Sequence, residues 1–215
     1  MTTINRQSGG IGWRPAAFAV LILTLVAATA CGDPLGQYMP LSVTNYWVYD
    51  VAAEGGGRRK VMEQVVARSG DKFTLNNGEV LLYLPDQAIL NKQGVMILDK
   101  NMRLGHEWVD SEMHFEITAK KGEVSVPAGT FRETLEVTWT TKYPGDLEST
   151  TGVTPTLEPG PNPRVFIYRT IYAKGVGKVR EEFRTIQPNG TQTVEFVAEL
   201  LEYKLRPRGA KMKAK

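Results

Sequence analysis

Cysteine and histidine are nearly absent from this sequence. Among its 215 residues there is one cysteine, Cys31, and there are two histidines, His106 and His114. A disulfide framework requires paired cysteines, and a structural zinc site requires several cysteine or histidine ligands. The composition therefore excludes disulfides and thiol-ligated metals, so the hydrophobic core and the hydrogen bonds must stabilise the fold.

Motifs of known catalytic chemistry are lacking as well. The chain has no Gly-x-Ser-x-Gly elbow, and His106-Glu107 lacks the second histidine of a zincin helix. Gly175-Val176-Gly177 lacks the longer glycine pattern and the helix start of a phosphate-binding loop. Glu181 and Glu182 are adjacent, so in a strand they point to opposite faces and cannot act as a pair. We expect no catalytic residues and no cofactor, and hence a non-enzymatic protein.

One group of side chains has the composition of a metal site. In an extended segment, His114 shares a face with Glu112 and Glu116, and a histidine with two carboxylates suits several divalent metals. The opposite face carries Met113 and Phe115 and is the apolar one. The His/Glu face is therefore expected to be solvated, and we predict no metal site.

The first thirty residues differ from the rest of the chain. Arg6 and Arg14 are their only charges, an uncharged apolar stretch follows from Pro15 to Val26, and small residues lead to Ala30. This order is typical of a secretory signal peptide. A spanning helix needs about 20 continuous apolar residues, which this stretch does not supply, so we predict a signal peptide over residues 1–30.

The only cysteine stands at the end of that segment. The sequence Ala28-Thr29-Ala30-Cys31 resembles the lipobox of bacterial lipoproteins, with Ala28 where that pattern usually has Leu. The resemblance implies that Cys31 carries the lipid and becomes the new N-terminus. Gly32 after the cysteine implies sorting to the outer membrane, facing the periplasm. The alternative is an ordinary secretory signal with an incidental cysteine.

Charge is unevenly distributed along the chain. The formal net charge is +3, yet six basic residues and no acidic ones follow from Lys204 onward, which leaves the rest of the exported chain net acidic. The segment 206–215 has Pro and Gly and no periodicity, so we predict a disordered basic tail. This tail either contacts anionic lipid headgroups or stays solvated. Nucleic acid is not an expected partner of a net acidic domain.

Alternation of apolar and polar residues dominates the chain after Cys31, and it predicts strands joined by short turns. The clearest case is Phe131–Lys142, where Leu135, Val137 and Trp139 share one face. The same pattern predicts strands near Tyr46–Val51, Arg59–Ala67, Lys72–Leu75, Glu79–Leu84, Gln87–Asn91, Val95–Asp99, Glu112–Ala119, Glu123–Val126, Arg164–Tyr172, Lys178–Ile186 and Thr193–Leu205. We predict an all-β domain over residues 41–205, after a tether over 31–40. The fold class is a mainly antiparallel meander that forms a strongly curved sheet or an incomplete barrel.

The segments between the strands have recognisable turn chemistry. Hairpins are predicted at 76–79, 91–94, 120–122 and 187–190, where Gly, often with Asn, supplies the positive φ of a tight turn. Residues 61–66 fit either a strand or an amphipathic helix, because apolar residues recur there at four-residue spacing. Residues 143–163 are rich in Pro, Gly, Ser and Thr and predict a long exposed loop.

Three stretches occur in this order in a group of uncharacterised β-rich bacterial envelope lipoproteins, which the chain resembles. They are Pro40–Tyr49, Val126–Phe131 and Gly175–Val179. In that group a Gly usually stands where this chain has Thr44. Physically, the second stretch suits a type I turn and the glycines of the third suit a bulge or a bend. No biochemical activity comes with the resemblance.

The tryptophans carry the binding prediction. Trp47 and Trp108 stand in short stretches that echo each other, which suggests that each opens a strand and packs on the inner face of the sheet. The alternative is functional: Trp47, Trp108 and Trp139 line a ligand groove. We expect an envelope lipoprotein that binds a partner protein or an apolar ligand on its sheet. The alternatives are an accessory subunit of a larger envelope complex and an enzyme with an unrecognised site.

Overall fold

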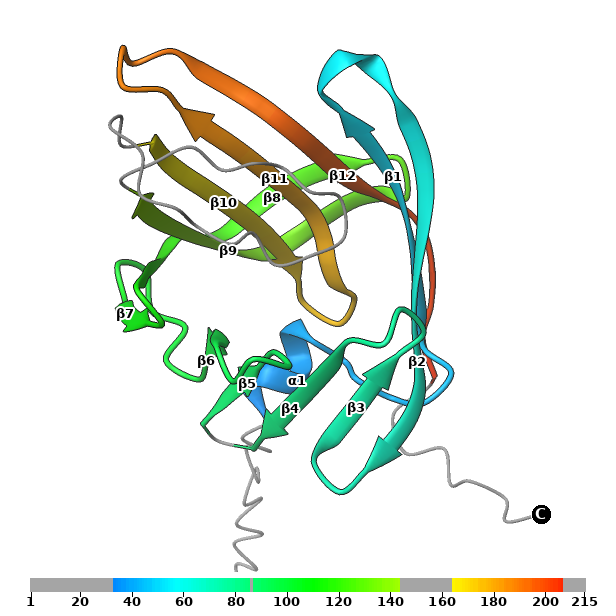
Figure 1. Ribbon diagram of the computed structural model, residues 1–215. Helices are drawn as coiled ribbons and strands as arrows, with labels where there is room; N and C mark the ends of the chain where they lie inside the picture. The colour runs from blue at the N-terminus through cyan, green and yellow to red at the C-terminus, as the bar shows by residue number, and fades with distance from the viewer. Residues whose placement is uncertain (1–32, 86, 144–163, 207–215) are drawn as a thin grey trace, which may run out of the picture. The chain divides into compact units, whose positions relative to one another are not determined.

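The computed structural model describes residues 33–85, 87–143 and 164–206 (Figure 1). These residues form one 12-stranded antiparallel sheet with the order β6-β5-β4-β3-β2-β1-β12-β11-β10-β9-β8-β7. The elements are α1 Pro34–Tyr38, β1 Tyr46–Ala53, η1 Glu54–Gly56, β2 Arg58–Ser69, β3 Lys72–Leu75, β4 Val80–Leu84, β5 Ala88–Leu90, β6 Met96–Asp99, β7 Glu107–Asp110, β8 Met113–Val126, β9 Gly129–Tyr143, β10 Arg164–Ala173, β11 Gly177–Ile186 and β12 Gln192–Lys204. The predicted all-β antiparallel meander is confirmed. The expected signal peptide, Cys31, most of the long loop and the basic tail from residue 207 lie outside the described residues.

The sheet curls until its two edge strands approach each other. These edges are β6 and β7, which are consecutive in the chain but are not paired by a backbone ladder. The backbone N–H of Met96 donates to Asp110 Oδ2 at 2.8 Å, and the Met96 carbonyl accepts from Trp108 Nε1 at 2.9 Å. Two side chains therefore bridge the edges, and the sheet is a nearly closed barrel with one unsealed seam.

Alternation along the strands places the core on the inner face of this sheet. In β9, Leu135 and Val137 are buried; Leu135 lies opposite buried Tyr172 of β10, and Val137 lies opposite buried Ile117 of β8. In β2, Val65 is buried while Met62 and Val66 are 46% and 48% exposed. Residues 61–66 are therefore strand. Their four-residue spacing arises because positions i and i+4 also share a face in a strand.

Most predicted hairpins are present, and each uses the glycine that the sequence offered. Gly78, Gly94 and Gly190 have φ of 83°, 84° and 82° in the turns after β3, β5 and β11. The two residues after Val126 form the turn between β8 and β9. Gly177 has φ 108°, and a Cβ there would approach Trp47 Nε1 to 3.1 Å. The glycines of Gly175–Val179 thus have a backbone role in the turn before β11, as predicted.

The predicted hairpin at residues 120–122 is wrong. β8 runs without interruption through this segment, and the extra residues are absorbed by register shifts against β9, between Ile117 and Ala119, Lys120 and Gly122, and Gly122 and Val124. Gly122 does not have the positive φ of a tight turn. It lies against β9 instead, where an added Cβ would meet Thr134 Oγ1 at 3.1 Å. Bulges of this kind bend a long strand, so a single curved strand replaces two short ones.

The segment expected as a tether contains a short helix, α1, which the alternation pattern did not predict. Its Leu35 and Tyr38 are buried in the core. Gln37 O accepts a hydrogen bond from the backbone N–H of Gly175 at 2.6 Å, which ties the helix to the turn before β11. The described chain therefore begins in a helix packed at one end of the barrel.

Candidate functional site

A row of aromatic rings crosses six strands on the inner face of the sheet. It consists of Trp108, Phe115, Trp139, Tyr168, Phe183 and Phe196, one from each strand from β7 to β12. Each ring lies directly opposite the next in the register of the sheet. Directly opposite residues point to the same face and contact each other. The register of five neighbouring strand pairs therefore assembles this aromatic row.

The rings are in contact along the whole row. Successive ring centroids are 5.1, 6.3, 5.2, 6.1 and 5.9 Å apart. Trp108 and Phe115 are stacked within 4° of parallel, and Trp139 and Tyr168 within 11°. These separations lie in the favourable range for aromatic pairs. The row is therefore a continuous apolar strip rather than a set of isolated side chains.

Burial changes along the aromatic row. Trp108 and Phe115 are 8% and 1% exposed and belong to the core. Trp139, Tyr168, Phe183 and Phe196 are only partly buried. The end of the row over β9–β12 is therefore less buried than the end over β7 and β8.

The structure brings together two of the three tryptophans predicted to line a groove. Trp108 and Trp139 both contact Phe115 in the aromatic row. Trp47 lies outside the row, where its ring is buried beside Gly177 and its Nε1–H donates to Val176 O at 2.7 Å. Trp47 and Trp108 are each the second residue of a strand and are buried. The structural interpretation of the echoed stretches is therefore confirmed, and the ligand groove stays a prediction.

A mostly buried charge cluster lies beside the aromatic row. Lys178 Nζ is 2.9 Å from Glu63 Oε1 and 3.0 Å from Glu181 Oε2, and it lies 5.0 Å from the centre of the Tyr49 ring. The three charged side chains are between 15% and 20% exposed. Burial lowers the pKa of Lys178, but the carboxylates of Glu181 and Glu63 outweigh it and hold the pKa well above its ordinary value. This lysine is thus a permanently charged group under physiological conditions.

Tyr168 joins the aromatic row to the charge cluster. Its ring stacks on Trp139, while its hydroxyl is hydrogen-bonded to Glu181. Burial is the main reason why the pKa of Tyr168 is raised well above its ordinary value, and the charge and hydrogen bond of Glu181 raise it further. The hydroxyl therefore stays protonated, and the inner face combines an aromatic wall with a fixed polar end.

The histidines do not gather with carboxylates around one point. His114 Nε2 lies 3.1 Å from Glu107 Oε2 on an exposed surface, while His106 Nε2 lies 3.5 Å from a different carboxylate, Asp99 Oδ1, and its ring stacks on Trp108. In the part of the chain that the structure describes, no three His, Cys, Asp or Glu side chains are placed to hold a metal ion. Glu181 faces the charge cluster, whereas Glu182 pairs with Arg180 and Arg184, so the two carboxylates diverge as predicted.

The helices within the described ranges include none that is both long enough and apolar enough to cross a membrane.

Comparison with known proteins gives structural likeness alone. No family model matches the chain, and no curated protein matches it. A Bacteroides fragilis crystal structure described as a "putative exported protein with YmcC-like fold" is 11% identical with a TM-score of 0.44, covering 76% of this chain and 97% of that one. A "putative lipoprotein" from Parabacteroides distasonis is 15% identical with a TM-score of 0.40, covering 76% and 96%. The chain is similar to these two proteins at a level that carries no argument about function.

Proposed function

We propose that this protein is a lipid-anchored lipoprotein of the bacterial envelope that holds an apolar ligand against its aromatic row without catalysing a reaction. The proposed anchor is Cys31, which follows an apolar stretch and small residues in the order of a lipoprotein signal. With Gly32 behind the cysteine, the proposed location is the outer membrane, with the domain facing the periplasm.

The aromatic row is the observation that carries the binding proposal. Aromatic rings bury large apolar areas and line many small-molecule sites. Four consecutive rings, from Trp139 to Phe196, keep accessible surface, and Tyr168 places a hydroxyl within that strip. A ligand that stacks on these rings replaces water at an apolar surface, and the adjacent polar group gives it an orientation. This arrangement favours an apolar molecule with one polar group.

The anchor is tested by intact mass measurement of the full chain extracted in detergent, with and without Cys31→Ala. A diacyl or triacyl addition that disappears in the variant supports the anchor. An unmodified cysteine in the wild-type protein would refute it and leave a secreted β-domain.

The binding proposal is tested with two substitutions on the aromatic row, Trp139→Leu and Phe183→Leu. Tyr46→Leu on the outer face is the matched control, since Tyr46 lies opposite Gln64 and Lys204, outside the row. Native mass spectrometry of the purified proteins should show an apolar small molecule on the wild type and the control, and its loss from both row variants. Equal occupancy of all four proteins would refute a site on the row.

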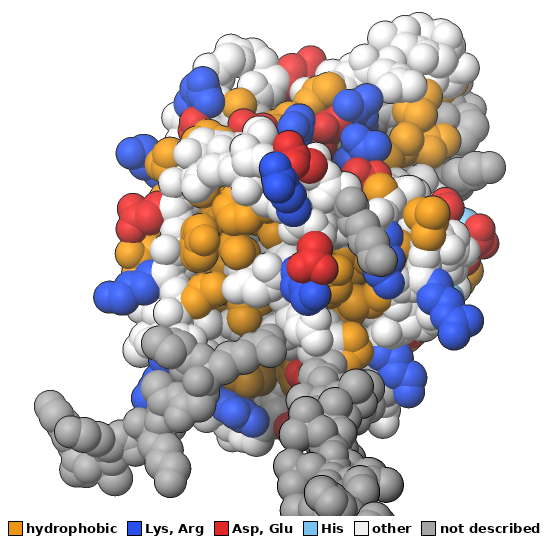
Figure 2. Space-filling model, turned by 180° about the vertical axis from the view of Figure 1, so that it is seen from behind, with side chains coloured by type: hydrophobic (Ala, Val, Ile, Leu, Met, Phe, Trp, Pro, Cys, Tyr) orange, Lys and Arg blue, Asp and Glu red, His pale blue; other side chains and the backbone are white. Residues whose placement is uncertain are grey.

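A second candidate is an accessory subunit of an envelope complex. Leu104 and Val109 are 66% and 72% exposed beside or within the edge strand β7, and large apolar side chains exposed at a sheet edge suit a protein contact. Hydrophobic side chains also gather among charged ones on the back of the molecule (Figure 2). Stoichiometric co-purification of one protein, lost on Val109→Ser, would favour this candidate over a free ligand binder.

A further inference from the structure

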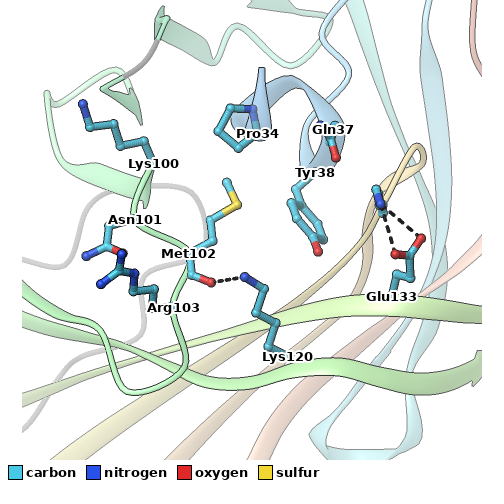
Figure 3. A pocket seen from close by; sticks show the side chains of 10 residues that line it. Pro34, Gln37, Tyr38, Lys100, Asn101, Met102, Arg103, Lys120 and Glu133 are labelled. Atoms are coloured by element: carbon cyan, nitrogen blue, oxygen red, sulfur yellow. Dashed lines mark hydrogen bonds and ion pairs between the residues drawn. The ribbon is translucent and has the colours of Figure 1, made fainter. Parts of the chain in front are cut away.

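A cleft of about 750 Å³ opens between α1, the segment 100–103 after β6, and the strands behind them. Its lining residues come from α1, the segment 100–103, β8, β9 and the turn before β11 (Figure 3). The lining residues are Pro34, Gln37, Tyr38, Lys100, Asn101, Met102, Arg103, Lys120, Glu133 and Lys174. This cleft lies apart from the aromatic row and shares no residue with it.

The cleft is strongly positive. Four of its lining side chains are cationic, namely Lys100, Arg103, Lys120 and Lys174, and the only acidic one is Glu133. Glu133 is already neutralised, since its Oε1 lies 3.0 Å from Lys174 Nζ. Among the described residues, Lys100 and Arg103 have no ion-pair partner. The cleft therefore holds uncompensated positive charge, which favours an anion.

Two hydrogen-bond donors face the middle of the cleft. Lys120 Nζ donates one hydrogen to Met102 O at 2.6 Å and retains two more, since an ammonium group has three. The Tyr38 hydroxyl points between Lys120 and Glu133 (Figure 3), and its ring is buried. This hydroxyl has no hydrogen-bond partner within the described ranges. Burial, its main perturbation, raises the pKa of Tyr38, so the hydroxyl stays protonated and can donate.

We propose that this cleft binds a phosphate group, held by Lys120, Arg103 and the Tyr38 hydroxyl. Phosphate offers several acceptor oxygens and negative charge, which match lysine as a point charge and arginine as a two-pronged donor. The cleft is much larger than one phosphate, so it has room for an organic substituent on it. The group could belong to a phospholipid headgroup or be a free phosphate, and the experiment below separates the two.

The position of the cleft favours the headgroup. Cys31 precedes Asp33, the residue before α1, by two positions, and a chain spans at most about 3.6 Å per residue. A lipid on Cys31 would hold α1 and its cleft near the membrane surface, and this placement rests on the proposed anchor. Positive charge thus gathers where the tether would join the membrane.

The test uses the full chain purified in nonionic detergent, at constant ionic strength set with chloride. In the first arm, inorganic phosphate is titrated by calorimetry. In the second, the protein is titrated with mixed micelles containing either phosphatidylglycerol or phosphatidylcholine. The variants are Lys120→Gln, Arg103→Gln and Tyr38→Phe. The matched control is Lys60→Gln, which removes one exposed positive charge from β2.

We expect saturable binding with one site per chain in at least one arm. Loss of a charged donor should weaken it about tenfold and loss of the hydroxyl roughly threefold, while Lys60→Gln changes it little. Binding in the first arm alone identifies free phosphate, and stronger binding of phosphatidylglycerol micelles identifies a headgroup. Either result supports the site. If no arm shows saturable binding, or if Lys60→Gln weakens it as much as Lys120→Gln, the proposal is wrong, because only general charge attraction is then at work.

Circular dichroism of each variant verifies that it is folded, and Tyr38→Phe keeps the buried ring in place. Failure of this proposal leaves the aromatic row untouched, because neither Trp139 nor Phe183 contributes to the cleft. Conversely, phosphate binding in the first arm would stand even if intact mass showed no acyl group on Cys31.

Discussion

Replacing Thr44 by glycine should make this protein more stable. Asn45 N–H donates to Ser42 O at 2.9 Å, which closes a tight turn over residues 42–45, and Thr44 is its third residue with φ 81°. The third position of a type II turn requires a positive φ and favours glycine. This chain forms the turn with the β-branched Thr44 at that position.

The magnitude follows from two opposing effects. A non-glycine residue held in this region costs about 1–3 kcal/mol, and glycine removes that cost. Glycine also increases the conformational entropy of the unfolded chain, which lowers the unfolding free energy by about 0.4–1 kcal/mol. The Thr44 side chain is exposed, so its loss removes no core packing, and the hydrogen bond from its N–H to Val65 O is kept. We expect a net stabilisation of about 1 kcal/mol, or a rise in Tm of about 2–4 °C for a domain of this size.

Urea denaturation followed by tryptophan fluorescence measures this difference directly. Thr191→Gly is the matched control: Thr191 is exposed in the turn before β12 and has no positive φ, so glycine there should lower stability. An unfolding free energy of Thr44→Gly equal to or below that of the wild type would show that the turn is not strained.

Two further predictions concern the barrel. Trp108→Phe keeps an aromatic ring but leaves the Met96 carbonyl without its hydrogen-bond donor at the seam. The unfolding free energy should therefore fall by about 1–3 kcal/mol, and the backbone amide hydrogens of β6 should exchange faster with solvent. Unchanged hydrogen exchange in β6 would contradict the bridge. Lys178→Met leaves the carboxylates of Glu63 and Glu181 in the interior without their cation, and the unfolding free energy at neutral pH should fall by about 3–5 kcal/mol. The pKa of Lys178 in the folded protein lies well above its ordinary value of 10.5. The ion pairs of Lys178 therefore stabilise the fold fully below pH 10.5, and this stabilisation is lost only as the pH rises through the pKa of the folded state. The difference in unfolding free energy between the wild type and Lys178→Met should therefore be constant from about pH 7 to 10 and become smaller above about pH 10. A difference that vanishes at about pH 8 would argue against the ion pairs.

The strands could be predicted because their pattern is local. Alternation over five to ten residues fixes which side chains face inward, and Gly beside Asn marks the turns. The errors arose where strand length and bending are decided by the partner strand. Lys120–Gly122 has turn composition, yet β9 continues opposite it and β8 bulges instead of folding back. The five residues of α1 are too few for a helical period, although Pro34 behind Asp33 is a typical helix start.

The candidate site could be predicted only in part, because it depends on register. The sequence singled out Trp108 and Trp139, but nothing local shows that Phe115 lies between them or that the row continues to Phe196. Trp47 has the same composition around it and lies elsewhere. The charge cluster was missed because Glu63 lies 115 residues from Lys178. The alternation pattern does place both residues on strands. Their side chains come together because β1 pairs with β2 on one side and with β12 on the other.

The bridges at the seam also bear on how copies of this protein behave toward one another. A sheet with two free edges presents unpaired N–H and C=O groups that can recruit an edge of another molecule, and repeated recruitment leads to fibres. Here the edges are only four residues long, they face each other, and Trp108 and Asp110 occupy both backbone groups of Met96. The same two hydrogen bonds that join the edges thus also hinder copies of this protein from polymerising through their edge strands.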